Sequence, residues 1–443
     1  MHAETTPRPR ARRSAPCTWL LLVLPLLCVL PAQAQLRIEI TSGVTDPIPI
    51  AIVPFGGTGQ GTDVADIVQH DLEGSGRFRA MPRSRMTSTP ARAADVVDAD
   101  WRAAGNDYVV VGQVSSLGTD TLAVDFTLIN DLNGQQLASQ RFTGSPAAMR
   151  DAAHRVSDVI YQKILGVRGA FDTRIAYVSV DGQPPAQRFQ LLVADADGAN
   201  PRVILESRQP IMSPAWSPDG QWLAYVSFEN RHSAIFVQQV RSGERRQVSA
   251  RAGINGAPAW SPDGRRLALT LGGSAGNPNI YVLDLATQAL TRITDDPFID
   301  TEAAWSADGR SLYFTSDRSG SPQIYRIGAE SGDRPRRITF SVPYAARPRL
   351  SPDGKQLAMV LQDGSNYRIG VQDLDSGTVT VLSHGHLDAS PSFAPNGAMV
   401  IYSGVENGHA VLERASVDGL TSQRLSADGA DVREPVWAPF ERD

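Results

Sequence analysis

Hydrophobic and polar residues follow one pattern in the first part of the chain and another beyond about residue 168. In the second part, short apolar runs alternate with turn residues, as in Trp222–Ser227 and Leu267–Leu271. A second apolar run follows each of them, and then a shorter polar one, for example Ile235–Val240 and Arg246–Ser249. Runs of this length between Gly, Pro and Asp indicate β-strands. Four strands per unit predict the blades of a β-propeller.

One short phrase marks the start of each unit. Residues Trp216–Gly220 read Trp-Ser-Pro-Asp-Gly, and similar copies begin at Trp260, Trp305, Leu350 and Phe393. Successive anchors, including a last partial copy at Trp437, lie 44, 45, 45, 43 and 44 residues apart. The phrase fits a tight turn, because Pro presets φ and Gly accepts a positive φ. A repeat of this length is typical of propellers.

The strand count predicts how the ring closes. The runs Ile175–Ser179 and Phe189–Ala194 form a unit without a preceding phrase, and the last run, Pro435–Pro439, has no blade after it. Pairing that last strand with the first unit gives six blades and leaves no open edge. We therefore predict a six-bladed, all-β propeller over residues 169–443.

Residues 35–168 contain no such repeat and predict a separate, mixed α/β domain. The last predicted helix has Ser145 as its N-cap, Pro146 in its first turn and Gly166 just beyond its end. The expected elements are strands at Ile48–Pro54, Tyr108–Ser115, Leu122–Asn130 and Gln135–Phe142, and helices at Asp63–Leu72, Asp95–Ala104 and Pro146–Leu165.

Residues 1–34 have the pattern of a secretory signal peptide. Arg8, Arg10, Arg12 and Arg13 precede the apolar run Leu20–Leu30, and Ala32-Gln33-Ala34 predicts cleavage after Ala34. The apolar pair expected after a twin-arginine signal is missing, which favours the general secretory route. Cys28 follows two Leu residues rather than a small one, so no lipid anchor is expected. These features predict an exported protein without direct membrane insertion.

Charge and cysteine usage narrow the classes of partner. Cleavage would remove four Arg and one Glu from 42 basic and 47 acidic residues, leaving a formal net charge of −8 and no cysteine. A mildly acidic surface without a basic stripe argues against a nucleic-acid partner. The exported chain would depend on core burial rather than on disulfides.

The search for catalytic chemistry gives weak candidates. Gly272–Gly276 matches the Gly-x-Ser-x-Gly nucleophile elbow at Ser274, but it falls between two predicted strands and the elbow needs a helix. Gly57–Gly61 lacks the lysine of a phosphate-binding loop. His384 and His386 have no evident third metal ligand. We expect a non-enzymatic protein with no cofactor and no metal site, a propeller-type hydrolase or lyase being the alternative.

The remaining candidate is the set of loops expected before the inner strands, which converge at one mouth of a propeller channel. Loops on a rigid scaffold often carry binding. A sugar- or wall-binding module is a further alternative, which exposed aromatic residues in the channel would favour. The loops are Ile211–Pro214, Ile254–Pro258, Asp300–Ala303, Tyr344–Pro348, His386–Pro391 and Asp431–Pro435.

The whole region after the signal peptide resembles the TolB family, the periplasmic component of the Tol–Pal envelope system. The phrase alone is shared by many propellers, whereas the opening segment, the α/β domain and six blades together are specific. The resemblance rests on Gln35–Gly43, Ile50–Phe55, Tyr108–Val114, Gly169–Val178, Met212–Gly220 and Asn255–Gly264.

The resemblance implies a monomeric scaffold that supports outer-membrane integrity and constriction at cell division. Its channel mouth would receive the lipoprotein Pal, which nuclease colicins mimic, and its N-terminal segment would bind the C-terminal domain of TolA. The implied Pal contacts are Met212, Ser213, Ile254, Asn255, Ala257, Thr301, Glu302, Arg347, Asp388, Ser390 and Glu434. The implied TolA contacts are Gln35, Leu36, Arg37, Ile38, Glu39, Ile40, Thr41 and Ser42.

This chain departs from the family pattern at Ile254, where well-known relatives have a histidine, and in the loops of blades five and six. Cations have been seen in some family channels, and Asp300, Glu302 and Asp388 are the carboxylates that could serve one here.

Overall fold

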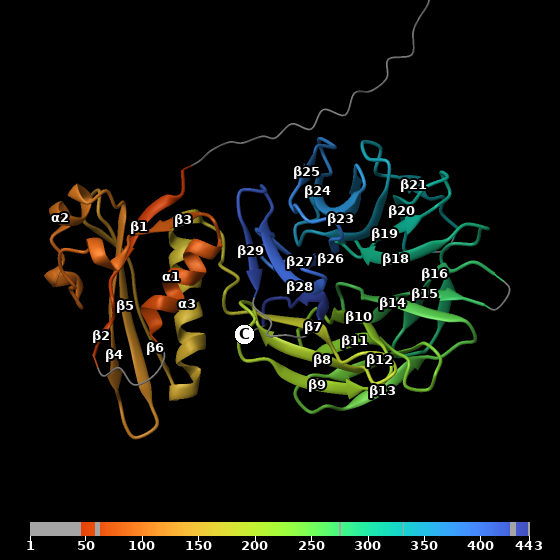
Figure 1. Cartoon of the computed structure of the whole chain (residues 1–443), viewed down its shortest axis with the longest axis horizontal. Helices are drawn as coiled ribbons and strands as arrows, with labels where there is room; N and C mark the ends of the chain where they lie inside the picture. Colours follow the sequence, from red (N-terminus) through yellow and green to blue (C-terminus); the bar gives the residue numbers. More distant parts are fainter. Residues whose placement is uncertain (1–45, 58–62, 274–275, 331, 426–430, 442–443) are drawn as a thin grey trace, which may run out of the picture. The chain divides into compact units, whose positions relative to one another are not determined.

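The structure, a computed structural model, describes residues 46–57, 63–273, 276–330, 332–425 and 431–441. The predicted signal peptide, the segment 35–42 and Ser274 lie outside the described residues. Within them, one sheet is built from N-terminal residues, and six four-stranded sheets follow (Figure 1). The predicted combination of an α/β domain and a six-bladed propeller is confirmed.

The N-terminal sheet has the strand order β3-β1-β4-β5-β6, with β2 paired to β4. β1 pairs in parallel with β3 and β4, and β4, β5 and β6 are antiparallel. The elements are β1 (Ile48–Ile52), β2 (Gly56–Gly57), α1 (Val64–Gly74), β3 (Phe78–Ala80), η1 (Arg83–Arg85), η2 (Ala93–Asp95), α2 (Asp98–Ala103), β4 (Tyr108–Ser116), β5 (Leu122–Asn130), β6 (Gln135–Gly144), η3 (Pro146–Ala148) and α3 (Met149–Leu165).

Side-chain alternation along β1 divides this domain into two apolar layers. Ile50 and Ile52 pack with the buried faces of α1 and α3, while Ala51 and Val53 pack on the other side with Trp101 of α2. Figure 1 shows α1 and α3 side by side against the sheet. The side chains through which β1 packs against α1 and α3 are buried. Burial of apolar surface, rather than intrinsic helix propensity, therefore stabilises this domain.

The ends of the helices follow local chemistry, with one correction to the sequence prediction. Asp63 caps α1 by accepting the Ala65 N–H at 3.0 Å, and Gly166 ends α3 at a φ of 77°. Ser145, the predicted side-chain cap, makes no such bond. The chain enters through the 3₁₀ turn η3, in which the Ala148 N–H donates to the Ser145 carbonyl at 2.9 Å, and α3 begins only at Met149.

Six blades follow, each with four antiparallel strands. Blade one combines β30 (Asp431–Trp437), β7 (Arg174–Asp181), β8 (Arg188–Asp195) and β9 (Arg202–Ser207). Blade two contains β10 (Ile211–Trp216), β11 (Trp222–Ser227), β12 (Ala234–Gln239) and β13 (Arg245–Ser249), and blade three contains β14 (Ile254–Trp260), β15 (Arg266–Gly272), β16 (Asn279–Asp284) and β17 (Leu290–Arg292). Blade four contains β18 (Asp300–Trp305), β19 (Ser311–Ser316), β20 (Gln323–Gly328) and β21 (Arg336–Arg337), and blade five contains β22 (Ala345–Leu350), β23 (Gln356–Asp363), β24 (Asn366–Asp373) and β25 (Val379–Val381). Blade six contains β26 (Ala389–Phe393), β27 (Met399–Glu406), β28 (His409–Ser416) and β29 (Ser422–Leu425).

The repeated phrase forms the turn between the first two strands of a blade. In the first copy the Gly220 N–H donates to the Ser217 carbonyl at 2.9 Å, and Gly220 has a φ of 67°. The Ser217 hydroxyl donates to Asp219 and accepts the Trp222 N–H at 2.9 Å. The same Ser–Asp bond recurs in the next three copies, so Asp has a bonding role that the turn prediction did not assign.

Candidate binding site at the channel mouth

The six inner strands, β10, β14, β18, β22, β26 and β30, carry the predicted mouth residues on their first halves. The sequence prediction placed these residues on loops, and the structure corrects this: most of them lie within the strands. Every inner strand has a break in its register at this point, for example between Met212 and Ala215 in β10. A β-bulge therefore lets the chain remain a strand while it redirects one side chain.

The bulges place one left-handed residue in each blade, at the equivalent position every time. A positive φ is uncommon for residues with a Cβ, since it costs roughly 1–2 kcal/mol. All six were among the predicted Pal contacts. They are Ser213, Ala257, Glu302, Arg347, Ser390 and Glu434, with φ between 44° and 58°.

Polar contacts link these left-handed residues from one blade to the next. The Arg347 Nε lies 2.7 Å from Glu302 Oε1, and the same guanidinium donates to the Ser390 hydroxyl. Glu434 accepts the backbone N–H of Ser213. Each of these bonds joins adjacent blades. We call the five polar residues at these positions, Ser213, Glu302, Arg347, Ser390 and Glu434, the polar ring.

An apolar rim surrounds the polar ring. Large hydrophobic side chains are exposed on the connections that enter the inner strands, with Ile254 50% and Phe340 71% accessible. Two of these residues, Met212 and Ile254, were among the predicted Pal contacts. The others could have been found only as apolar residues in otherwise polar loops. The rim consists of Met212, Ile254, Phe298, Ile299, Phe340 and Leu387.

The structure revises the part played by two predicted contact residues, because it buries their side chains. Asn255 accepts the Ser249 hydroxyl at 2.6 Å and the Arg251 N–H at 2.9 Å, and so holds the loop before β14. Asp388 accepts the Gly385 N–H at 3.1 Å and braces the loop before β26. Both shape the mouth from behind rather than presenting a surface to a partner.

The three carboxylates suggested for a cation do not share one. Arg318 lies 2.9 Å from both oxygens of Asp300, Glu302 is engaged by Arg347, and Asp388 is bound to backbone. Burial raises the pKa of Asp300 and of Asp388 above the usual range for a carboxyl group, against the effect of these hydrogen bonds.

The weak catalytic candidates acquire structural explanations. Gly272 ends β15 and Asn279 begins β16, so the described residues on either side of Ser274 belong to a connection between two strands, whereas the elbow needs a strand followed by a helix. Gly57 lies in β2, where a side chain would collide with the Val114 carbonyl; close strand pairing accounts for it. His384 and His386 are exposed, and neither belongs to a metal-sized group of ligands among the described residues.

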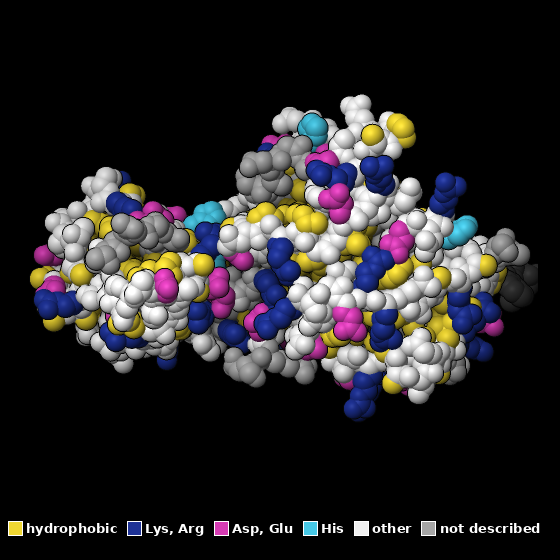
Figure 2. All heavy atoms as spheres, turned by 90° about the horizontal axis from the view of Figure 1, so that it is seen from below, with side chains coloured by type: hydrophobic (Ala, Val, Ile, Leu, Met, Phe, Trp, Pro, Cys, Tyr) yellow, Lys and Arg dark blue, Asp and Glu magenta, His cyan; other side chains and the backbone are white. Residues whose placement is uncertain are grey.

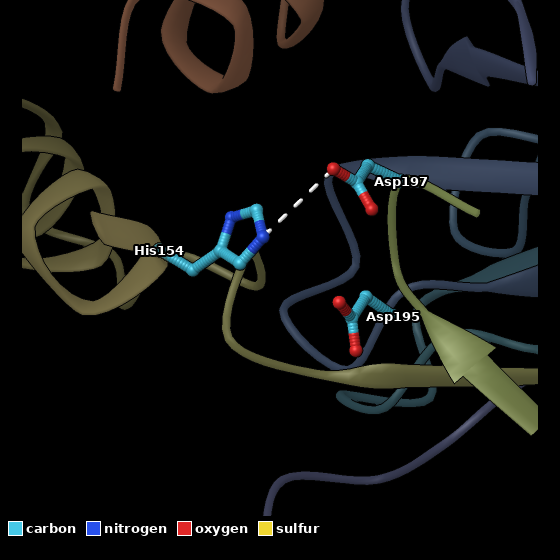
Figure 3. A group of neighbouring side chains, drawn as sticks. All are labelled: His154, Asp195 and Asp197. Carbon is cyan, nitrogen blue, oxygen red and sulfur yellow. Dashed lines mark ion pairs between the residues drawn. The ribbon is translucent and has the colours of Figure 1, made fainter. Parts of the chain in front are cut away.

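One such group does exist away from the mouth: His154 on α3, Asp195 at the end of β8 and Asp197 in the turn that follows (Figure 3). Arg150 already pairs with both carboxylates. The His154 Nδ1 lies 2.8 Å from Asp71, and its Nε2 faces Asp197 at 3.8 Å. Burial alone would lower the pKa of His154, but Asp71 and Asp197 outweigh it and raise that pKa. These contacts make the group an ion-pair network rather than a metal site.

The same network does not have the geometry of a catalytic triad. A triad needs its nucleophile bonded to the histidine. Here the buried Ser157 hydroxyl donates to Asp71 at 2.7 Å. Ser157 and His154 therefore both contact the carboxylate of Asp71, and the serine is not hydrogen-bonded to the histidine as a triad requires.

One face of the molecule can be inspected for a basic band of the kind that nucleic-acid binding needs. On the face shown in Figure 2, basic and acidic side chains are interspersed without a continuous basic band. A continuous stripe would be needed to track phosphates. Among the described residues, none of the helices combines the length and the apolar character needed to cross a bilayer.

Comparison with known families and proteins agrees with this architecture. The model of the TolB amino-terminal domain matches residues 36–137, and that of the TolB beta propeller domain matches residues 161–441. The Tol-Pal system protein TolB of Xanthomonas oryzae pv. oryzae is 46% identical over 434 residues, which cover 96% of this chain and 98% of that protein. The protein of the same name from Xanthomonas campestris pv. campestris matches equally.

Among solved structures, the crystal structure of TolB from Acinetobacter baumannii is similar over 89% of this chain and 97% of that one. Its sequence identity is 42%, and the TM-score is 0.84.

Proposed function

Because the chain belongs to the TolB family, we propose that its channel mouth binds the lipoprotein Pal and that its N-terminal segment binds TolA. The chain is a non-enzymatic, periplasmic component of the Tol–Pal system, which supports outer-membrane integrity and constriction at cell division. The residues proposed to bind Pal follow from the geometry of the mouth, and those proposed to bind TolA follow from the pattern of residues 35–42.

The apolar rim around the polar ring is the observation that carries the Pal proposal. Six large apolar side chains are exposed where the chain enters the inner strands, and exposed apolar surface of this kind marks sites of protein interaction. Ile254, Phe298 and Phe340 belong to classes that contribute strongly when a partner buries them. The polar ring inside the rim would supply specificity, since Glu302 and Arg347 present both signs of charge.

Ala257 and Thr301 lie between the rim and the axis, in β14 and β18. Both are half-buried, and the Thr301 hydroxyl lies 3.3 Å from that of Thr270. A long side chain at either position would occupy the space that an inserting partner needs, without touching the blade cores.

The TolA proposal rests on alternation in the N-terminal segment. Leu36, Ile38 and Ile40 alternate with polar residues, which is the pattern of a strand that can add to the edge of a partner's sheet. Gly43 and Pro47 would let the segment detach from the domain that follows.

A titration against the soluble domains of Pal and of TolA tests both assignments. Ala257→Arg and Thr301→Arg should weaken Pal binding by roughly a hundredfold, while leaving TolA binding intact. Deletion of residues 35–42 should abolish TolA binding and leave Pal binding intact. Ala286→Arg, an identical change at an exposed turn of the same blade as Ala257, is the matched control and should affect neither.

Unchanged Pal affinity in both arginine variants would move the Pal site away from the mouth. Full TolA affinity after the deletion would place that contact elsewhere in the chain. Repeating the TolA titration with Pal bound reports whether the two sites are coupled, which we expect at about 1–3 kcal/mol.

A further inference from the structure

The axial channel ends in a cavity of about 540 Å³ on the face opposite the mouth. The second halves of the six inner strands and residues that directly follow these strands line it. Every inner strand starts at the mouth and runs toward its turn, so the cavity and the mouth are separate ends of one channel. A cavity of this volume is in the range that holds a small molecule.

The cavity wall is apolar apart from hydroxyls and one charged side chain, Arg349 of β22. Arg349 occupies the position just before the aromatic or Leu residue of the repeat. In register it pairs with Ala358, as the equivalent Ala215 pairs with Ala224. The six equivalent residues are Ala215, Ala259, Ala304, Arg349, Ser392 and Val436, of which five are short.

The Arg349 guanidinium has few partners of its own. Its Nη1 donates to the Pro348 carbonyl at 2.8 Å, and no carboxylate of a described residue lies within 4.0 Å. The two acids that act on it electrostatically are already engaged: Glu302 by Arg347 and Glu434 by the Ser213 N–H. An arginine remains protonated even where burial disfavours its charge. Arg349 therefore lines the cavity with guanidinium donors that no carboxylate of a described residue takes up.

The indole groups of the aromatic wall offer no free donor to a ligand. Trp216, Trp260 and Trp305 each donate the indole N–H to a backbone carbonyl of the preceding blade, at 3.0–3.2 Å. Trp216 and Trp305 are more than nine-tenths buried between blades. The wall thus offers apolar edges and proline rings, and the charge comes from Arg349 alone.

We propose that this cavity binds a small anionic ligand with an apolar body, whose carboxylate, sulfonate or phosphate group contacts Arg349. The apolar part would lie against the proline and aromatic side chains of the wall. The competing explanation is that the aliphatic part of Arg349 merely fills the space beside five short neighbours.

Two fluorescent probes of the same shape separate these explanations. 8-Anilinonaphthalene-1-sulfonate carries the anionic group, and N-phenyl-1-naphthylamine has the same rings without it. Titrated into the chain from residue 35 to 443, the sulfonate should bind at one site and more tightly than the amine. Arg349→Met retains the apolar stem and should weaken sulfonate binding by roughly tenfold or more, with amine binding unchanged.

Two further variants complete the design. Arg349→Lys keeps the charge and should keep most of the preference for the sulfonate. Lys355→Gln removes an exposed charge from the next turn of the same blade and should change nothing. Pal binding and near-ultraviolet circular dichroism of Arg349→Met report its fold. Equal affinity of the wild type and Arg349→Met for the sulfonate would overturn the proposal, as would equal affinity of the wild type for the two probes.

Discussion

At the scale of single residues, the repeated left-handed conformation is the most informative feature of the channel mouth. Strain of this kind persists where the surrounding structure enforces it, and it clusters at functional sites. Glycine would remove the strain at each position, yet none of the six left-handed residues is glycine. Glycine would also remove the side chains that make up the polar ring, including the pair Glu302 and Arg347.

Ala257 allows the strain to be measured, because it has the shortest of these side chains and a φ of 44°. Ala257→Gly should raise the free energy of unfolding by about 0.5–1 kcal/mol, the relief of the left-handed strain exceeding the added entropy of the unfolded chain. Urea denaturation measures this. Asn407→Gly is the control: Asn407 has a φ of 50°, which asparagine tolerates, so little change is expected. An Ala257→Gly variant no more stable than the wild type would show that this backbone is not strained.

At the scale of elements, the strands were predictable where a strong turn signal fixes them. The Pro-Asp-Gly turns placed β11 at Trp222–Ser227, as predicted, and the other second strands to within a few residues. The backbone conformation at the mouth was predicted less well, because residues such as Ser, Glu and Arg give no indication in the sequence that they adopt a positive φ. The contact between Glu302 and Arg347 joins residues 45 positions apart, and local pattern cannot reveal it.

The sequence also contained no indication that Asn255 and Asp388 are buried, because polar residues in loops are normally exposed. Likewise, α3 could be recognised from its apolar face and from Gly166, but its 3₁₀ entry depends on backbone bonding rather than on a side-chain cap.

One element carries a titratable group with a strong effect on stability. Asp158 of α3 is buried and accepts the N–H groups of Phe171 and Asp172, at 2.8 Å and 3.3 Å. Burial raises its pKa to about 7 in spite of these bonds. The unfolded chain ionises this group near pH 4. The folded state therefore loses stability as the pH rises from about 4 to about 7, and retains it at lower pH.

Asp158→Asn should remove this dependence while keeping one acceptor oxygen. Relative to the wild type, the variant should gain roughly 2–3 kcal/mol more at pH 8 than at pH 5, as measured by urea denaturation at both values. Asp151→Asn, on the exposed first turn of the same helix, is the matched control for replacing a carboxylate by an amide on this helix. Parallel pH profiles for wild type and Asp158→Asn would contradict the assignment.

At the scale of the whole molecule, the propeller depends on contacts between the two ends of its sequence. The last strand, β30, pairs with β7 and supplies the inner strand of blade one, as predicted. Trp437 joins this strand to its surroundings: its N–H donates to Ser392 at 3.0 Å and its indole to Thr173 at 2.8 Å. Blade two depends on the same strand, because the Trp216 indole donates to the Val436 carbonyl.

Removal of residues 433–443 should therefore affect more than one blade. The truncation leaves β7 as an open edge and removes the buried Trp437, whose loss alone would cost roughly 3–5 kcal/mol. We expect a much lower melting temperature and concentration-dependent association of the truncated protein. Removal of residues 441–443 alone should leave the melting temperature nearly unchanged, because Glu441, the one described residue among them, forms a largely exposed ion pair with Arg174. A synthetic peptide spanning residues 429–441 should restore much of the stability in trans, because it would again pair with β7. A truncated protein that melts and dissolves like the intact one would show that the ring does not need β30 to close.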